Sequence, residues 1–280
     1  MITSLISMKG GTAKTTTAVN LAAYLALGGL RVLLVDLDPQ NFATLCLGLD
    51  VQSLKYSLAD VLLEERPMQD AIVPTGVPGL SIVPADRRLA SSDVLLADVP
   101  GREKILKGRI DKLRLRYDHI LIDNPPSLNL LTINALIASD NYVITVSPSY
   151  LSLVGLQSLL ETVDVIKKNM HSKVELLGIL PTMVDFRMKI TTETLISCAH
   201  TSKRRCSRPS SGTTSSCWRR PLTARRSSST TAAAWARCAT SILERNFSRG
   251  VEARQERPFL LNTDKAGPKR FASRRFSSRR

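Results

Sequence analysis

The sequence lacks long hydrophobic runs and the cysteine patterning of a secreted domain. No stretch of about eighteen apolar residues occurs among its 280 residues, which excludes a membrane-spanning helix, although 43% of the residues are hydrophobic. The start, MITSLISMKGG, lacks the basic-then-apolar layout of a secretory signal, and the five cysteines form no CxxC pair. We therefore expect a cytoplasmic protein with a sizeable core and reduced cysteines.

Positive charge is unevenly distributed along the chain. The formal net charge is +15, yet residues 1–195 hold 19 basic and 20 acidic residues, so the whole excess lies in residues 196–280. That second part carries basic clusters such as Lys203-Arg204-Arg205 and shows no sustained apolar period. We expect a globular domain over 1–195 and a basic tail of low order over 196–280.

Short β-branched runs alternate with helical patterns in the first part. Buried strands are expected at Ile2–Ser7, Arg31–Asp36, Leu80–Val83, His119–Asp123, Tyr142–Val146 and Leu176–Leu180. Helices are expected at Thr15–Leu27, Ser57–Leu63, Leu128–Ala138 and Leu153–Lys168. This alternation favours an α/β fold with a doubly wound, mostly parallel sheet, in which ligands bind at the carboxyl ends of the strands.

A glycine-rich segment, KGGTAKTT, lies between the first expected strand and the first expected helix. Its glycines let backbone N–H groups face an anion, and a helix N-terminus adds its dipole. Lys14 can neutralise phosphate charge, and the Thr15 hydroxyl can bind Mg²⁺. A flexible surface turn is the alternative, but the strand–loop–helix context favours a phosphate loop. Its members are Lys9, Gly10, Gly11, Thr12, Ala13, Lys14, Thr15 and Thr16.

Three carboxylates follow expected strands. Asp36 and Asp38 lie in RVLLVDLDPQ, where alternation places both on one face near the phosphate loop. One of them is expected to support a metal and the other to orient water, and the residues alone leave open which does which. Asp123 ends HILID, the Walker B arrangement that places a carboxylate near Mg²⁺.

These motifs together resemble the ParA/Soj/MinD family of dimeric ATPases with a deviant Walker A motif. The resemblance covers roughly residues 1–195, includes IDNPPSLNLLTINAL and PTMVDFR, and favours the ParA/Soj branch. It implies that Lys9 reaches the partner subunit's nucleotide in an ATP sandwich dimer. It also implies that Asp38 positions the attacking water, so that Lys9, Lys14 and Asp38 serve catalysis. Thr15, Asp36 and Asp123 would then support the metal.

The resemblance further implies a function and partners. The expected cofactors are ATP and Mg²⁺, and the expected activity is hydrolysis that drives a monomer–dimer cycle on nonspecific DNA during chromosome or plasmid partitioning. Arg187, with its neighbour Lys189, matches a basic position that contacts DNA in some members. A ParB-like protein would stimulate hydrolysis, the protein would associate with the nucleoid, and no membrane would be involved.

Three positions depart from the family pattern. Met8 replaces a common Gln, Ala13 stands where Gly is frequent, and Asn41-Phe42 replaces the usual Gly-Asn. Two other functions remain open at this stage. A MinD-like membrane-positioning ATPase would need an amphipathic C-terminal helix. A non-enzymatic nucleic-acid binder would act through the basic tail.

The tail itself suggests a shifted reading frame. Codons can be chosen for Gly212–Phe247 so that the neighbouring frame encodes a segment containing EAPSHGK, which resembles the family's C-terminal region. We hypothesise that residues from about 196 to 247 are read in the wrong frame. A genuine basic arm that binds DNA or RNA is the competing interpretation.

Overall fold

The computed structural model describes residues 1–185 and residue 187. Lys189, the predicted basic tail over 196–280 and the hypothesis of a shifted frame lie outside the described residues. None of the helices in the described part of the chain is both long and apolar enough to cross a bilayer.

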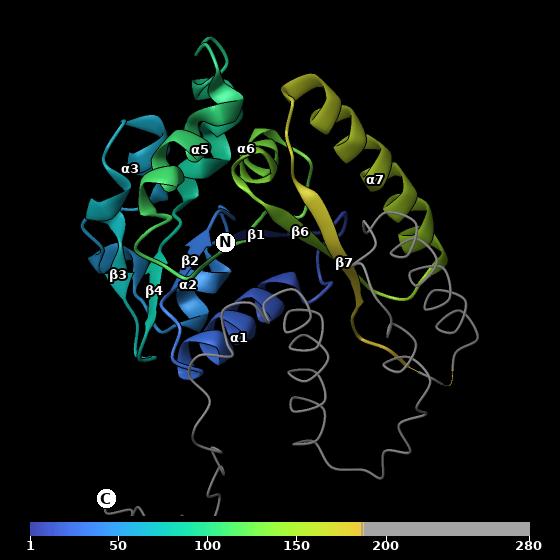
Figure 1. The fold of residues 1–280 in the computed structure, drawn as a ribbon, viewed down its shortest axis with the longest axis horizontal. Coiled ribbons are helices and arrows are strands. Elements are labelled where there is room, and N and C mark those ends of the chain that lie inside the picture. The colour runs from blue at the N-terminus through green and yellow to red at the C-terminus, as the bar shows by residue number, and fades with distance from the viewer. Residues whose placement is uncertain (186, 188–280) are drawn as a thin grey trace, which may run out of the picture. The chain divides into compact units, whose positions relative to one another are not determined.

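A parallel sheet forms the middle layer of the described part (Figure 1). Its seven strands are β1 (Ile2–Ile6), β2 (Val32–Asp36), β3 (Val73–Pro74), β4 (Leu80–Val83), β5 (His119–Asp123), β6 (Asn141–Val146) and β7 (Glu175–Pro181). Their order in the sheet is β3-β4-β2-β5-β1-β6-β7, and only β3 runs antiparallel to its neighbour. The predicted doubly wound, mostly parallel sheet is confirmed.

Helices cover both faces of this sheet. They are α1 (Lys14–Leu27), α2 (Phe42–Cys46), α3 (Leu58–Leu63), α4 (Ser92–Leu95), α5 (Ile105–Ile110), α6 (Leu130–Ala138) and α7 (Tyr150–Met170), joined in places by short 3-10 turns. Helix α1 lies on one face, while α5, α6 and α7 lie on the other (Figure 1). The long loops between parallel strands are therefore helical crossovers, as parallel pairing requires.

Two apolar clusters hold the helices to the sheet. In the first, Leu33, Val35 and Ile122 of the central strands pack with buried residues of α3, α5 and α6. In the second, the inner faces of β6, β7 and α7 meet around the buried ring of Tyr142. Each fully buried aliphatic side chain stabilises the fold by about 1.5–3 kcal/mol. The carboxyl ends of the strands are thus held in position by two packed apolar clusters.

The helices α3 and α6 have side-chain caps at their N-termini, whereas α1, which follows the phosphate loop, has none. Helix α3 begins with a capping box in which Ser57 and Asp60 bond each other's backbone N–H groups, and α6 begins at Asn129, whose side chain accepts from the Thr132 N–H. Helix α1 has Ala13 at this position and no side-chain cap. Its first N–H groups are left without the side-chain partner that the other two helices have.

Candidate nucleotide-binding site

Strand register brings the predicted residues to one edge of the sheet. Strand β5 lies between β1 and β2, with Asp123 opposite Leu5 on one side and opposite Asp36 on the other. The phosphate loop follows β1 directly, so it starts beside both carboxylates. This is the carboxyl edge at which parallel sheets bind ligands, as predicted.

The phosphate loop contains two left-handed residues. Gly11 has φ +73° with open space around its Cα, and Ala13 has φ 54° and ψ 29°. For an alanine this conformation costs roughly 1–2 kcal/mol. The residue that departs from the family's frequent Gly therefore keeps the left-handed backbone and carries strain. Because the turn ends at the uncapped start of α1, its N–H groups suit an anion.

Hydroxyl groups from distant strands hold this loop in place. The Thr12 hydroxyl lies 3.0 Å from the Thr145 hydroxyl, and the Thr182 hydroxyl donates to the Thr12 carbonyl oxygen at 2.9 Å. Ser7 donates to the Lys9 carbonyl oxygen at 3.1 Å. Thr12, Thr145 and Thr182 are all buried. Sequence reasoning missed Thr145 and Thr182, because no local pattern marks a threonine that meets a loop more than a hundred residues away.

Lys14 forms a buried ion pair with Asp123. Its Nζ lies 2.8 Å from Asp123 Oδ1, and the two side chains are 6% and 0% exposed. The second carboxylate oxygen, Asp123 Oδ2, is buried without a hydrogen-bond partner among the described residues. Burial raises the pKa of Asp123 despite the opposing charge of Lys14. An oxygen in this position is suited to accept a further cation or its bound water.

Asp36 is the second fully buried carboxylate. Its Oδ2 accepts from the Thr44 hydroxyl at 2.7 Å and from the Thr44 N–H at 2.9 Å, while Oδ1 accepts weakly from the Asp38 N–H at 3.3 Å. Burial, together with the nearby charge of Asp123, raises the pKa of Asp36 to about 7. Two neighbouring carboxylates in such a place are held ionised most readily by a cation.

Asp38 sits where β2 turns toward α2. It is 6% exposed, and its Oδ1 accepts from the Gln40 N–H at 2.9 Å. Its charge contributes to the raised pKa of Asp123, so the two carboxylates are electrostatic neighbours. Asn41, which replaces the family's usual Gly, adopts φ 51° at the start of α2. Asn tolerates this left-handed backbone better than most residues, so the departure at residue 41 preserves the turn.

The structure thus gathers some predicted residues and separates others. Lys14, Thr15, Asp36, Asp38 and Asp123 converge at one strand edge. Lys9, Gly10 and Gly11 form the exposed outer part of the loop, and Thr16 is exposed on α1.

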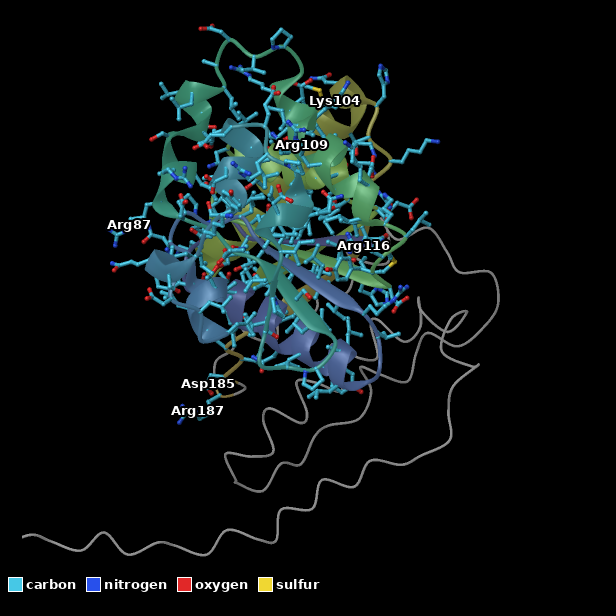
Figure 2. All side chains as sticks on the ribbon, turned by 90° about the vertical axis from the view of Figure 1, so that its left-hand side faces the viewer. Arg87, Lys104, Arg109, Arg116, Asp185 and Arg187 are labelled. Atoms are coloured by element: carbon cyan, nitrogen blue, oxygen red, sulfur yellow. The ribbon has the colours of Figure 1, made fainter. Side chains whose placement is uncertain are left out.

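Arg187 lies outside that cluster. It pairs with Asp185 at 2.7 Å and is 90% exposed, in the lower part of Figure 2. Its guanidinium lowers the pKa of Asp185 to about 2. Its predicted contact with DNA stays a prediction.

The donor set fits a magnesium–nucleotide complex. No group of three or more His, Cys, Asp or Glu side chains in residues 1–185 and 187 is arranged to hold a metal by itself. Mg²⁺ in phosphate sites typically takes one or two carboxylates, with phosphate and water oxygens completing its shell. Asp123, with its unpartnered oxygen, Asp36 and the Thr15 hydroxyl supply such a partial set.

Fold and site together define a P-loop domain of the ATPase class. An AAA domain family matches residues 1–176. The sporulation initiation inhibitor protein Soj of Bacillus subtilis (strain 168) is 43% identical over 189 residues, covering 68% of this chain and 75% of that protein. The chain belongs to the ParA/Soj family of partitioning ATPases, as its motifs predicted. The chromosome partitioning protein ParA of Myxococcus xanthus (strain DK1622) is 41% identical over 189 residues, 68% of this chain and 67% of that one.

A solved structure shares the fold. The crystal structure named cobyrinic acid a,c-diamide synthase from Mycobacterium smegmatis, with bound ADP and magnesium, has a TM-score of 0.73 and 32% identity. The match covers 89% of this chain and 95% of that chain. Its bound ligands show that this fold accommodates a nucleotide with magnesium.

Proposed function

We propose that the chain binds ATP with Mg²⁺ at this site and hydrolyses it to drive a cycle between a monomer and an ATP-dependent dimer on nonspecific DNA. The cycle serves chromosome or plasmid partitioning. The observation that carries the proposal is the convergence of Lys14 with Asp36, Asp38 and Asp123 around the phosphate loop. Partitioning is favoured over the synthase activity because the identities to Soj and ParA, 43% and 41%, exceed the 32% to the synthase structure.

Each residue has a role that follows from its chemistry. The loop N–H groups from Gly10 to Thr16 cradle phosphates, and Lys14 neutralises their charge. Thr15, Asp36 and Asp123 would hold Mg²⁺, which supplies further neutralisation of developing negative charge when bound. Asp38, which is buried in the turn beside them, orients the attacking water.

Lys9 acts across the proposed dimer. Its side chain stands on the exposed outer part of the loop, where a second subunit can approach. A second positive charge on the transferred phosphoryl group would stabilise its transfer. A ParB-like protein is the proposed stimulator of hydrolysis, and Arg187 and Lys189 are the proposed DNA contacts.

Substitution of Asp38 tests the proposal. Asp38→Ala is expected to retain ATP binding, followed with a fluorescent ATP analogue, and to lose phosphate release by roughly a hundredfold or more. The matched control is Asp98→Ala, which removes an exposed aspartate away from the strand edge. Hydrolysis at the wild-type rate by the Asp38 variant would refute the assignment of Asp38.

A second function is favoured by one observation, the excess positive charge of residues 196–280. A non-enzymatic nucleic-acid binder would retain DNA through this tail whether or not ATP is present. Truncation after Leu195 separates the two functions: ATP-gated DNA retention that survives truncation supports the partitioning cycle, and retention lost regardless of ATP supports the tail.

A further inference from the structure

An open pocket lies at the edge of the sheet opposite the nucleotide site. It has a volume of about 450 Å³, and its lining includes Arg31, Arg116 and Tyr117. Arg31 immediately precedes β2, and Arg116 and Tyr117 shortly precede β5, so the pocket lies at the amino ends of these strands. Asp36 and Asp123 stand at the carboxyl ends of the same two strands. The pocket is therefore separate from the phosphate loop.

One wall of the pocket is apolar and is built by the β3–β4 hairpin. The Thr75 hydroxyl donates to the Leu80 carbonyl oxygen at 2.9 Å and accepts from the Val77 N–H at 3.1 Å, which fixes the turn between the two strands. Pockets of roughly 300–1,000 Å³ with apolar walls and a few polar groups are typical of small-molecule sites. The apolar residues of this wall are Pro74, Val77, Pro78 and Leu80.

Arg31 brings hydrogen-bond donors to the pocket but no net charge. Its Nε and Nη2 donate to the two carboxylate oxygens of Asp118 at 3.2 Å and 2.9 Å. The hydrogen bond from Arg31 lowers the pKa of Asp118 to about 2, so the two charges compensate each other at neutral pH. Its Nη1 makes no hydrogen bond within the described part of the chain and is available to a ligand.

Arg116 is the uncompensated charge of the pocket. Its guanidinium is exposed and makes no ion pair or hydrogen bond with another described residue. No Asp or Glu occurs among the described residues that line the pocket. The hydroxyls of Ser81 and Tyr117, which also line it, have no hydrogen-bond partner in residues 1–185 and 187. The pocket thus combines one net positive charge with several free donors.

We propose that this pocket binds a small carboxylate with an apolar body. The charged end pairs with Arg116, whose planar fork matches the two oxygens of a carboxylate, and the body lies against the apolar wall. A single uncompensated cation balances a single negative charge, whereas a phosphate monoester carries about −1.5 to −2 charges and would be left partly unneutralised. The proposal does not rest on the proposed function, since neither ATP nor DNA takes part in it.

Two probes of the same shape test the proposal on the full chain without nucleotide. Diphenylacetate carries the carboxylate, and diphenylacetamide replaces it with a neutral amide. Isothermal titration calorimetry measures the dissociation constant of each. Diphenylacetate is expected to bind about tenfold more tightly than the amide, because hydrogen bonds to a charged group are stronger than those to a neutral one.

Substitution of Arg116 locates the charged end of the ligand. Arg116→Gln is expected to weaken diphenylacetate binding by about tenfold and to leave amide binding unchanged. The side chain is exposed, so the fold is preserved. The matched control is Arg109→Gln on α5, which removes an arginine that does not line the pocket and should bind both probes like the wild type. Figure 2 shows Arg109, Arg116 and Arg187 well apart from one another.

A variant of the wall tests the apolar body. Val77→Ser shortens an apolar side chain that lines the pocket and is expected to weaken both probes by a similar factor. The proposal would be overturned by a wild type that does not bind diphenylacetate, by unchanged binding in Arg116→Gln, or by an equal loss in Arg109→Gln. Tighter binding of diphenylmethylphosphonate than of diphenylacetate would make the site a phosphate site and the proposal wrong.

ATP turnover on the same preparations separates this proposal from the proposed function. Loss of diphenylacetate binding in Arg116→Gln with wild-type turnover supports a pocket that is distinct from the nucleotide site. A wild type that bound diphenylacetate through Arg116 but hydrolysed no ATP would refute the proposed function alone.

Discussion

The buried ion pair between Lys14 and Asp123 predicts that removing the Lys14 ammonium greatly lowers the free energy of unfolding, and that a second substitution can restore it. In Lys14→Met the ammonium is removed and Asp123, which is 0% exposed, is left as an uncompensated buried charge. Removing one partner of such a pair costs about 3–5 kcal/mol of the free energy of unfolding. Nucleotide binding is lost as well, because the same ammonium is the one expected to meet the phosphates.

A second substitution should restore stability without restoring binding. In Lys14→Met/Asp123→Asn both charges are gone, so most of the lost free energy of unfolding is expected to return. Urea unfolding without nucleotide, followed by far-ultraviolet circular dichroism, gives these values, and a fluorescent ATP analogue reports binding. If Lys14→Met were as stable as the wild type, or if the double variant were no more stable than the single one, the pair would not form as described and the reasoning would be wrong.

Three further predictions concern the loop and its surroundings. Ala13→Gly relieves a left-handed alanine and is expected to raise the free energy of unfolding by about 1 kcal/mol in the same urea assay; a decrease would mean that residue 13 is unstrained. The pKa of Asp36 is raised to about 7, so stability that is fully present below its unfolded value near 4 is lost as the pH rises through about 7. Without magnesium, Asp36→Asn should therefore flatten the dependence of the melting temperature on pH over that range, and an unchanged profile would contradict the raised pKa. Thr182→Val leaves the Thr12 carbonyl oxygen short of a donor, which is expected to cost about 1–3 kcal/mol and to weaken nucleotide binding, with Thr162→Val on the exposed side of α7 as the control.

The sequence predicted most of the sheet because its strands carry their own signal. β1, β2, β4, β5, β6 and β7 are short buried runs bounded by turn residues, and each end was predicted to within one residue. β3 was missed, since the two residues Val73–Pro74 carry no periodicity and a proline there suggests a turn. The short helices α2, α4 and α5, of four to six residues, were missed, although the equally short α3 was predicted.

The residues of the candidate site also fall into those that the sequence predicted and those that it did not. The loop and its three aspartates could be found because each motif is contiguous and ends a recognisable strand. The clamp by Thr145 and Thr182 and the pairing of Lys14 with Asp123 could not, because both arise from the packing of strands far apart in the chain. The strained backbone at Ala13 was also hidden, since the residue type alone suggested only that alanine would fit.

The Thr182 hydroxyl links the edge strand β7 to the phosphate loop through a hydrogen bond. Immediately after β7, the Thr182 hydroxyl donates to the Thr12 carbonyl oxygen, and the Thr182 backbone N–H donates to the Val146 carbonyl oxygen. The phosphate loop is thus held in place partly by a residue at the end of the edge strand β7, and not by the turn alone. A small shift of β7 would lengthen this hydrogen bond and so change the position of Thr12 in the phosphate loop, although Thr182 lies far from the loop in the sequence.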